Sequence, residues 1–310
     1  MPLSDFYGVY YEAFDADTAF EFYEKVRSGL PVATCPDSSC RASGLLEIAD
    51  DIDVFVFDAY GVLNVGSTPI AGAPQVVSTL RERGKRVFVL TNSATFPARR
   101  NFEKFAKFGF DFSSEEIISS RMAAQQYIEN LPPMRWGVMG KRNSAPQEFN
   151  GETRILGDDP DDYEWAEAFL LLSTWEWSVE RQILLDQAYE KRARLMVVAN
   201  PDVIAPLELA FSTEPGFIGH RTVRRFGADV VFHGKPFPSV FEMVMQKLGP
   251  QQERSRIAMV GDTLHTDVLG GAAQGWSTVL VSDHGLFRGR DVAKPIAESQ
   301  IVPTYIVPQI

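Results

Sequence analysis

The chain alternates short apolar segments, rich in Val, Ile and Phe, with longer amphipathic segments of helical length. Five apolar segments are predicted strands of one sheet, because each is apolar at both alternating positions, as in a parallel sheet covered by helices on both faces. These strands are residues 53–58, 86–91, 230–233, 257–262 and 277–281. Helices are predicted at 73–83, 97–107 and 236–248, with Pro in the first turn or Gly just past the end. The alternation predicts an α/β fold with a doubly wound, mostly parallel sheet.

A long insert separates the second predicted strand from the third. About 140 residues lie between them, whereas a complete strand–helix–strand unit needs only about 30. The insert has predicted strands of its own at 136–139, 168–173 and 195–199 and a helix at 179–191. We therefore expect an inserted α/β domain, a core in two parts and an N-terminal extension that contains an amphipathic, aromatic-rich stretch at 14–26. The expected bounds are 131–225 for the inserted domain, 51–130 and 226–310 for the core, and 1–50 for the extension.

The charge composition argues against nucleic acid and membrane surfaces as binding partners. Thirty Lys and Arg residues against 41 Asp and Glu give a net charge of −11, so no basic surface is expected for nucleic acid or anionic lipid. The apolar stretches fall far short of the roughly 20 residues that span a bilayer, and no secretory signal is visible, so a cytoplasmic location is expected. Cys35 and Cys40 are too few for a disulfide scaffold, and two free loop thiols are favoured over half of a metal site.

Polar side chains gather where the predicted strands end. Asp58 ends the first strand, the Thr-Asn-Ser sequence 91–93 ends the second, Lys235 follows the third, Asp262 ends the fourth and Asp267 comes five residues later. The carboxyl ends of parallel strands meet at one edge, where open α/β sheets bind ligands. A single carboxylate there is commonly a turn or capping residue, but three at one edge repel each other unless a cation intervenes. The set is therefore interpreted as a site for Mg²⁺, which prefers oxygen ligands, and for phosphate.

Four motifs make this interpretation specific. They are Asp58-x-x-Gly-Val-Leu, Thr91-Asn-Ser, Gly234-Lys-Pro and Gly261-Asp-Thr-Leu-x-Thr-Asp267. In this order they resemble the motifs of the haloacid dehalogenase (HAD) superfamily, and the match covers most of the core. The long insert, the segment 69–73 and the Asn200-Pro-Asp202 sequence resemble subclass IIA, the sugar- and nucleotide-phosphatase-like branch with a large α/β cap.

The resemblance implies a phosphatase that works in two steps. Asp58 would attack phosphorus to form an aspartyl-phosphate, which water then hydrolyses, while Thr91 and Lys235 hold the transferring group. Asp58, Asp262 and the backbone carbonyl of Tyr60 would bind Mg²⁺. Asp267 would be a further ligand or would hold metal-bound water or Lys235. The implied partner is a small phosphorylated molecule.

The first motif departs from the phosphatase pattern. Phosphatases of the family have a second Asp two residues after the nucleophile, which protonates the leaving oxygen and later activates water, and this chain has Tyr60 there. Tyrosine, with a pKa of about 10, is a poor base at neutral pH. The Asp-Ala-Tyr-Gly sequence resembles the true dehalogenases, which need no metal but lack the acidic fourth motif. We favour a phosphatase and retain two alternatives, a weakened or inactive phosphate- and Mg²⁺-binding relative and a dehalogenase.

Further candidates have plain structural alternatives. His265, and less directly His233, could supply the missing proton, although a structural histidine is commoner. The sequence itself does not indicate an oligomeric state, and the resemblance adds a homodimer as one option, because caps of this branch often pair. The remaining candidates for substrate contact are Asn92, Ser93, Asn200 and Asp202, together with the aromatic side chains Trp165, Trp175 and Trp177.

Overall fold

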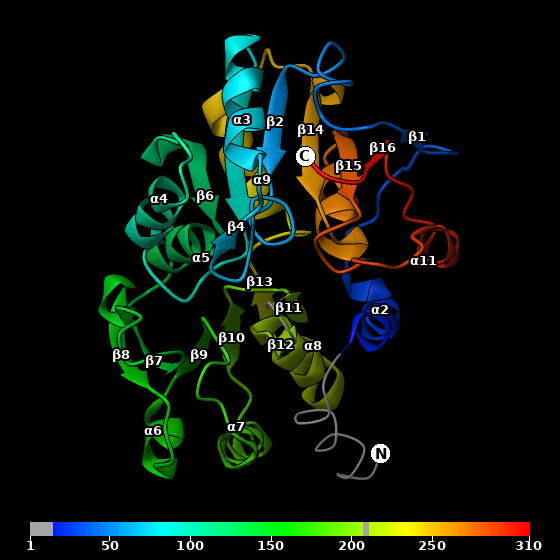
Figure 1. The fold of residues 1–310 in the computed structure, drawn as a ribbon. Coiled ribbons are helices and arrows are strands. Elements are labelled where there is room, and N and C mark those ends of the chain that lie inside the picture. The colour runs from blue at the N-terminus through cyan, green and yellow to red at the C-terminus, as the bar shows by residue number, and fades with distance from the viewer. Residues whose placement is uncertain (1–14, 207–210) are drawn as a thin grey trace.

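The computed structural model describes residues 15–206 and 211–310, and Figure 1 shows two sheets in it, one above the other. The core sheet has seven strands in the order β1-β16-β15-β14-β2-β5-β6, and the inserted sheet has five in the order β13-β10-β9-β7-β8. All pairs in both sheets are parallel. In those orders the core strands are Cys40–Arg41, Tyr305–Val307, Ser277–Val281, Ile257–Gly261, Val54–Phe57, Arg86–Thr91 and Ile117–Ser119. The inserted strands are Val230–Phe232, Leu195–Val198, Ala168–Leu171, Met134–Met139 and Gly151–Ile155.

Helices cover both faces of the core sheet, as the sequence predicts. Phe55 and Phe57 of β2 pack in one buried cluster with side chains of α3 and α4, whereas Val54 and Val56 pack in another with side chains of α5 and α9. This alternation confirms the doubly wound α/β fold. The helices are α2 (Ala16–Lys25), α3 (Ala73–Glu82), α4 (Ala98–Lys107), α5 (Ser120–Glu129), α6 (Pro160–Trp165), α7 (Val179–Lys191), α8 (Pro215–Phe226), α9 (Pro238–Leu248), α10 (Leu269–Ala273) and α11 (Ala293–Ser299).

Short elements connect these layers. Two antiparallel hairpins pair β3 (Asn64–Val65) with β4 (Thr68–Pro69) and β11 (Ile204–Pro206) with β12 (Phe211–Thr213). One-turn 3₁₀ helices occur at Arg27–Gly29, Ser114–Glu116, Pro146–Glu148 and Arg254–Arg256, and a wider π-helical turn at Leu264–Val268 follows β14. Within the described ranges, no helix combines the length and apolar character needed to cross a membrane.

One strand prediction is wrong. Residues 230–232 form β13, which pairs with β10 of the inserted sheet rather than with the core sheet. The reason is the short connection, since α8 ends at Phe226 and only three residues separate it from β13. α8 packs closely on this sheet, because a Cβ at Gly219 would lie 2.7 Å from side-chain atoms of both Val198 and Phe232. We therefore propose that the inserted domain ends after Phe232 rather than at residue 225.

The N-terminal extension does not stand apart from the rest of the chain. Its β1 pairs with β16 and forms an edge of the core sheet. The amphipathic stretch at 14–26 contains α2, which begins after Asp15, whose side chain accepts a hydrogen bond from the Thr18 backbone in a capping box. Residue 14 lies outside the described residues. Cys35 and Cys40 are free thiols.

Candidate active site

The core sheet directs its polar side chains into one pocket. Asp58 directly follows β2, whose four side chains are all buried, and its N–H donates to the carbonyl of Val260 at 2.8 Å. Thr91 is the last residue of β5, and Asp262 follows β14. These carboxyl ends open on a pocket of about 500 Å³. The motifs at Asp58, Thr91 and Asp262 therefore gather at one edge of the core sheet, as predicted.

The inserted sheet opens on the same pocket by its own carboxyl ends. The pocket is lined by Lys141 after β7, Ser173 after β9, Asn200 and Asp202 after β10, and Lys235 after β13. Lys235 therefore reaches the site from the inserted sheet, and not from the core sheet as the strand prediction implied. The pocket is bounded by the carboxyl edges of two parallel sheets, which is the position where such sheets bind ligands.

Lys235 lies among the carboxylates of the site. Its ammonium contacts Asp58 Oδ1 and lies 2.7 Å from Asp267 Oδ1. Asp58, Asp262 and Asp267 each offer a carboxylate oxygen, and these oxygens lie within 4.8 Å of one another. Three buried carboxylates around one ammonium leave an excess of negative charge. The Lys235 contact also agrees with one of the two roles expected for Asp267, that of holding the lysine.

Asp262 is held by hydrogen bonds. Its Oδ2 accepts from the Leu286 N–H at 2.8 Å, and its Oδ1 accepts from the Thr263 hydroxyl at 3.0 Å. The surrounding backbone comes very close, since a Cβ at Gly61, where φ is +77°, would lie 2.4 Å from Asp262 Oδ2, and one at Gly285 would lie 1.8 Å from it. Among the described residues, no cationic side chain forms an ion pair with Asp262.

The pKa values of the buried carboxyls and of Lys235 are shifted by burial and by the charges of their neighbours. Burial raises the pKa of Asp58 to about 6, with Lys235 opposing this and the charge of Asp267 adding to it. Burial raises the pKa of Asp262 to about 8, and repulsion from Asp267 and Asp58 contributes. Burial alone would lower the pKa of Lys235, but the carboxylates of Asp267, Asp58 and Asp202 raise it above its usual value. The site thus favours an added cation near Asp262.

Asn92 holds the backbone of Lys235. Its Oδ1 accepts from the Lys235 N–H at 2.8 Å, and its Nδ2 donates to the Lys235 carbonyl at 3.0 Å and to Asp202 Oδ1 at 2.8 Å. Both amide donor hydrogens therefore have protein partners. We propose that Asn92 positions Lys235 and Asp202 rather than binding substrate. Ser93 lines the pocket, with its N–H bonded to Thr91 Oγ1 at 3.2 Å.

Tyr60 lines the pocket at the position of the missing acid. The ammonium of Lys104, from α4, lies 4.4 Å from the centroid of its ring. Burial lowers the pKa of Lys104 to about 8, although the charge of Asp58 opposes the shift. Lys104 could not be expected from the sequence, because its place within α4 gives no motif signal.

Neither histidine is placed to supply the missing proton, and both have structural partners instead. His265 Nε2 lies 2.6 Å from Glu24 Oε1, and its ring stacks on Tyr23. His233 Nδ1 lies 3.1 Å from the Ser239 hydroxyl. Both rings are buried and neither lines the pocket. His265 faces α2, a helix more than 200 residues earlier in the chain, so it takes the structural role given above as the commoner alternative and is not the proton donor.

Glu214 is a buried carboxyl that the sequence analysis missed. It lines the pocket, accepts from Asn200 Nδ2 at 2.9 Å and accepts from the Ser212 hydroxyl at 2.5 Å. Burial raises its pKa to about 7, and the Ser212 hydrogen bond opposes the rise. Asn200 Oδ1 also accepts from the Asp202 N–H at 3.1 Å, so Asn200 shapes the loop that carries Asp202.

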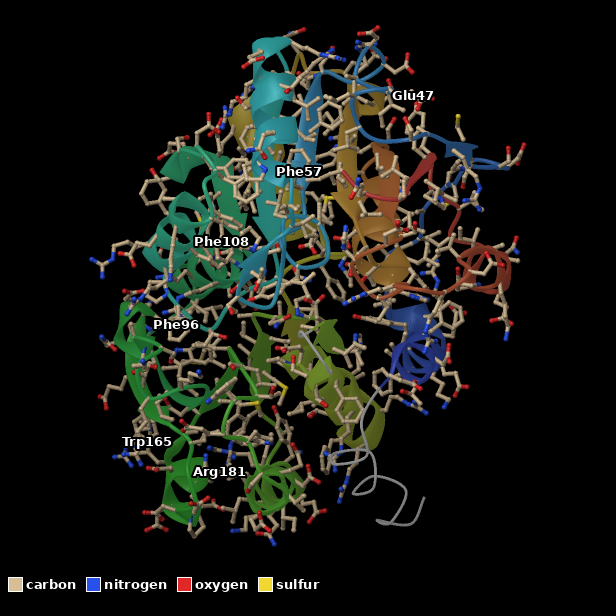
Figure 2. All side chains as sticks on the ribbon, in the orientation of Figure 1. Glu47, Phe57, Phe96, Phe108, Trp165 and Arg181 are labelled. Carbon is tan, nitrogen blue, oxygen red and sulfur yellow. The ribbon has the colours of Figure 1, made fainter. Side chains whose placement is uncertain are left out.

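Two of the three tryptophans reach the pocket. Trp175 and Trp177 line it, and the Lys141 ammonium lies 3.5 Å from the centroid of the Trp175 ring. Trp165 does not line it and lies far out on the inserted half, whereas Phe96 lies where the two halves meet (Figure 2). Lys141 could have been expected from the sequence, because it follows a predicted strand in the same way as Asp58 does.

Comparison with known proteins places this geometry in a family. The model of the haloacid dehalogenase-like hydrolases matches residues 55–150, and a HAD-hydrolase-like model matches 232–310. Phosphoglycolate phosphatase 2 of Arabidopsis thaliana is 29% identical over 267 residues, covering 77% of this chain and 86% of that protein. Glycerol-3-phosphate phosphatase of Homo sapiens is 27% identical over 303 residues, covering 88% and 92%.

A solved structure shows the same arrangement of both halves. It is described as a possible sugar phosphatase of the HAD superfamily from Cytophaga hutchinsonii, and it is 25% identical to this chain with a TM-score of 0.76, covering 88% of this chain and 98% of that one. The two family matches contain the motifs at Asp58, Thr91, Lys235 and Asp262, and together they span more than half of the chain. The chain therefore belongs to the haloacid dehalogenase superfamily of hydrolases, among its subclass IIA phosphatases.

Proposed function

We propose that this chain is a Mg²⁺-dependent phosphatase of small phosphomonoesters that works through an aspartyl-phosphate on Asp58. The observation that carries the proposal is the contact of Lys235 with Asp58 and Asp267 inside a pocket bounded by two sheet edges. The pocket of about 500 Å³ suits a small substrate such as a sugar phosphate or a short phosphorylated acid. Relatives named as phosphatases of small phosphorylated molecules support this choice.

The carboxylates fit a divalent cation. Mg²⁺ takes oxygen ligands, and the site offers three carboxylates of which Asp262 has no cationic partner among the described residues. Asp58 and Asp262 would hold the ion, with the Tyr60 carbonyl as a predicted third ligand. When bound, the ion would supply positive charge beside the phosphoryl oxygens. Asp267 would hold Lys235.

The residues of the chain would divide the work of phosphoryl transfer. A carboxylate oxygen of Asp58 forms a bond to phosphorus while the bond to the ester oxygen breaks. The Lys235 ammonium, which contacts the carboxylate before the reaction, and the Thr91 hydroxyl would offset charge on the phosphoryl oxygens. Water then attacks phosphorus, phosphate leaves and the Asp58 carboxylate is restored.

Asp202 is our candidate for the missing acid and base. It lines the pocket, and Asn92 binds its carboxyl group. Burial raises its pKa well above the usual value, with repulsion from Asp58 and Asp267 adding and Lys235 opposing. A protonated Asp202 could give its proton to the leaving oxygen, and the resulting carboxylate could take one from the attacking water.

The test is a screen of phosphate esters with and without Mg²⁺, using the wild type and Asp58→Asn. We expect hydrolysis of small alkyl phosphates that requires both Mg²⁺ and Asp58. Retained hydrolysis in Asp58→Asn would end the covalent mechanism. Binding of Mg²⁺ and phosphate without turnover of any ester would favour the non-catalytic alternative, and metal-independent halide release from a 2-haloacid would favour the dehalogenase.

A further inference from the structure

We propose that helix α2 of the N-terminal extension completes the substrate pocket, and that the Tyr23 hydroxyl donates a hydrogen bond to an oxygen of the bound phosphoester. This inference rests on the proposed function and adds to it a substrate-binding residue. Tyr23 lines the same pocket as Asp58 and Lys235. It lies outside the matched family segments, 55–150 and 232–310, so no family motif points to it.

Helix α2 contacts the half of the molecule that contains the core sheet. Glu24 Oε1 lies 2.6 Å from His265 Nε2, within the turn that follows β14. The Tyr23 and His265 rings stack with their centroids 4.9 Å apart and an angle of 5° between their planes. Asp17, at the start of the helix, forms an ion pair with Arg290. These contacts hold α2, and with it Tyr23, against the core half beside the pocket.

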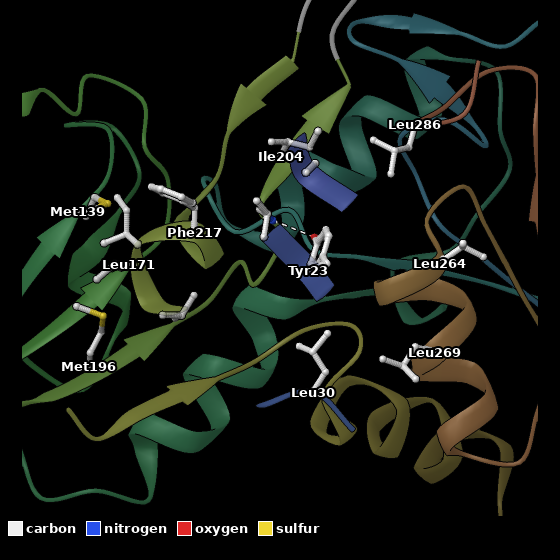
Figure 3. Packing of buried hydrophobic residues seen from close by; sticks show 14 of the residues in the cluster. Tyr23, Leu30, Met139, Leu171, Met196, Ile204, Phe217, Leu264, Leu269 and Leu286 are labelled. Atoms are coloured by element: carbon white, nitrogen blue, oxygen red, sulfur yellow. Dashed lines mark hydrogen bonds between the residues drawn. The ribbon is translucent and has the colours of Figure 1, made fainter. Parts of the chain in front are cut away.

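The same helix is fastened to the inserted half. The Val203 N–H donates to the Tyr23 hydroxyl oxygen at 3.0 Å, and the Phe22 ring lies 4.9 Å from that of Phe217. Figure 3 shows Tyr23 between residues of the inserted half, such as Phe217, and residues of the core half, such as Leu264. Tyr23 thus lies at the junction of the two halves.

The O–H group of Tyr23 is available to donate a hydrogen bond to a ligand. A phenol oxygen can accept hydrogen bonds and donate one. The Val203 N–H uses its accepting side, and within the described ranges no protein acceptor takes its proton. Burial raises the pKa of Tyr23 well above its usual value, and the charges of Asp202, Asp267 and Asp262 add to the rise. The hydroxyl therefore stays protonated, and a buried donor that faces a pocket calls for an acceptor in the ligand.

The ligand chemistry that supplies such an acceptor is an anionic oxygen. A hydrogen bond to a charged partner contributes more than one to a neutral partner. A phosphoryl oxygen of the ester, or a carboxylate oxygen of its organic part, would accept the hydrogen bond from the Tyr23 hydroxyl. Val203, the residue after Asp202, donates its N–H to the Tyr23 hydroxyl, so the loop that carries the acid candidate also positions the phenol.

The experiment compares Tyr23→Phe with Tyr189→Phe. Each change removes one buried hydroxyl and one hydrogen bond, since the Tyr189 hydroxyl donates to the Arg194 carbonyl at 3.3 Å, and Tyr189 does not line the pocket. The readouts are kcat and KM for an alkyl phosphate, the affinity of the Mg²⁺-loaded protein for inorganic phosphate, and thermal unfolding.

We expect Tyr23→Phe to lower kcat/KM roughly tenfold or more, and Tyr189→Phe to leave it within about twofold of the wild type. Similar losses of thermal stability in both variants would show that the difference lies in the site. Equal kcat/KM and equal phosphate affinity for Tyr23→Phe and the wild type would overturn the proposal. A wild type that binds phosphate but hydrolyses no ester would end the proposed function alone, and the phosphate affinities would then decide the role of Tyr23.

Discussion

The two sheets of this molecule both open on the pocket by the carboxyl ends of their strands, but they place different kinds of side chain there. Both are parallel, and both place the residues that follow their strands in the same pocket. The core sheet contributes the carboxylates of Asp58 and Asp262, whereas the inserted sheet contributes the cations of Lys141 and Lys235 and the amide of Asn200. The comparison teaches that the pocket is built across the gap between two sheets, because Asp58, the proposed nucleophile, and its ammonium partner Lys235 come from opposite edges.

The largest effect is expected from Asp58, the proposed nucleophile. Asp58→Asn should lower kcat by a factor of about 10³ or more, because the amide cannot form the acyl-phosphate. The matched control is Asp53→Asn, which changes the residue just before the other end of β2, where Asp53 pairs with Arg256 at 2.7 Å. Steady-state kinetics with one alkyl phosphate check both variants. Equal losses in the two would show that the carboxyl edge of the core sheet has no special role.

A slightly smaller effect is expected from Asp202, which follows β10 of the inserted sheet. Asp202→Asn should lower kcat for alkyl phosphates about 10²- to 10⁴-fold and for aryl phosphates much less, because aryl leaving groups need little protonation. In that background Tyr60→Asp should restore part of the alkyl activity by returning an acid to the usual position. If Asp202→Asn slows both classes of ester equally, Asp202 is not the proton donor, and Tyr60→Asp alone should then raise alkyl phosphate hydrolysis.

Stability tests the metal site without turnover. The folded pKa of Asp262, about 8, lies above the value of about 4 in an unfolded chain, so its contribution is fully present at low pH and is lost as pH rises toward about 8. Without metal, the melting temperature should therefore fall from pH 5 to pH 8.5. Asp262→Asn should weaken this slope and raise the melting temperature at pH 8 by a few degrees.

Added Mg²⁺ should raise the melting temperature of the wild type at pH 8 and leave that of Asp262→Asn nearly unchanged. The control is Asp161→Asn, an exposed carboxyl on α6, which should behave as the wild type does. Equal stabilisation of Asp262→Asn by Mg²⁺ in calorimetric scans would place the ion elsewhere.

The smallest effect is expected from Lys141, which lines the pocket at the edge of the inserted sheet. Lys141 lies over Trp175 and, within the part of the chain that the structure describes, forms no ion pair with a carboxylate. Lys141→Met should raise KM about three- to tenfold for esters that carry a second anionic group and leave KM for neutral alcohol esters unchanged. Lys107→Met, an exposed lysine on α4, serves as the control. A uniform change in KM across both ester classes would argue against charge recognition by Lys141.

The sequence predicts the parts of the site that depend on local order along the chain. Asp58 and Asp262 follow strands whose apolar pattern is unmistakable, so the edge rule places them without tertiary information. The pattern cannot tell which sheet a strand joins, and β13 was assigned to the wrong one. Tyr23 and Glu214 could not be predicted either, because their roles depend on contacts and burial that no motif records.

The contacts of α2 with residues much later in the chain also have a consequence for synthesis on the ribosome. The helix is made early, but Val203 follows Tyr23 by 180 residues and His265 follows Glu24 by 241. At bacterial to eukaryotic elongation speeds of about 5–20 residues per second, the finished helix waits roughly 10–50 seconds for His265. A chain halted before His265 should therefore leave α2 open to protease, whereas the complete chain should protect it. The pocket would then be completed only after residue 265 has been made, so that a shorter product carries Asp58 without a closed site.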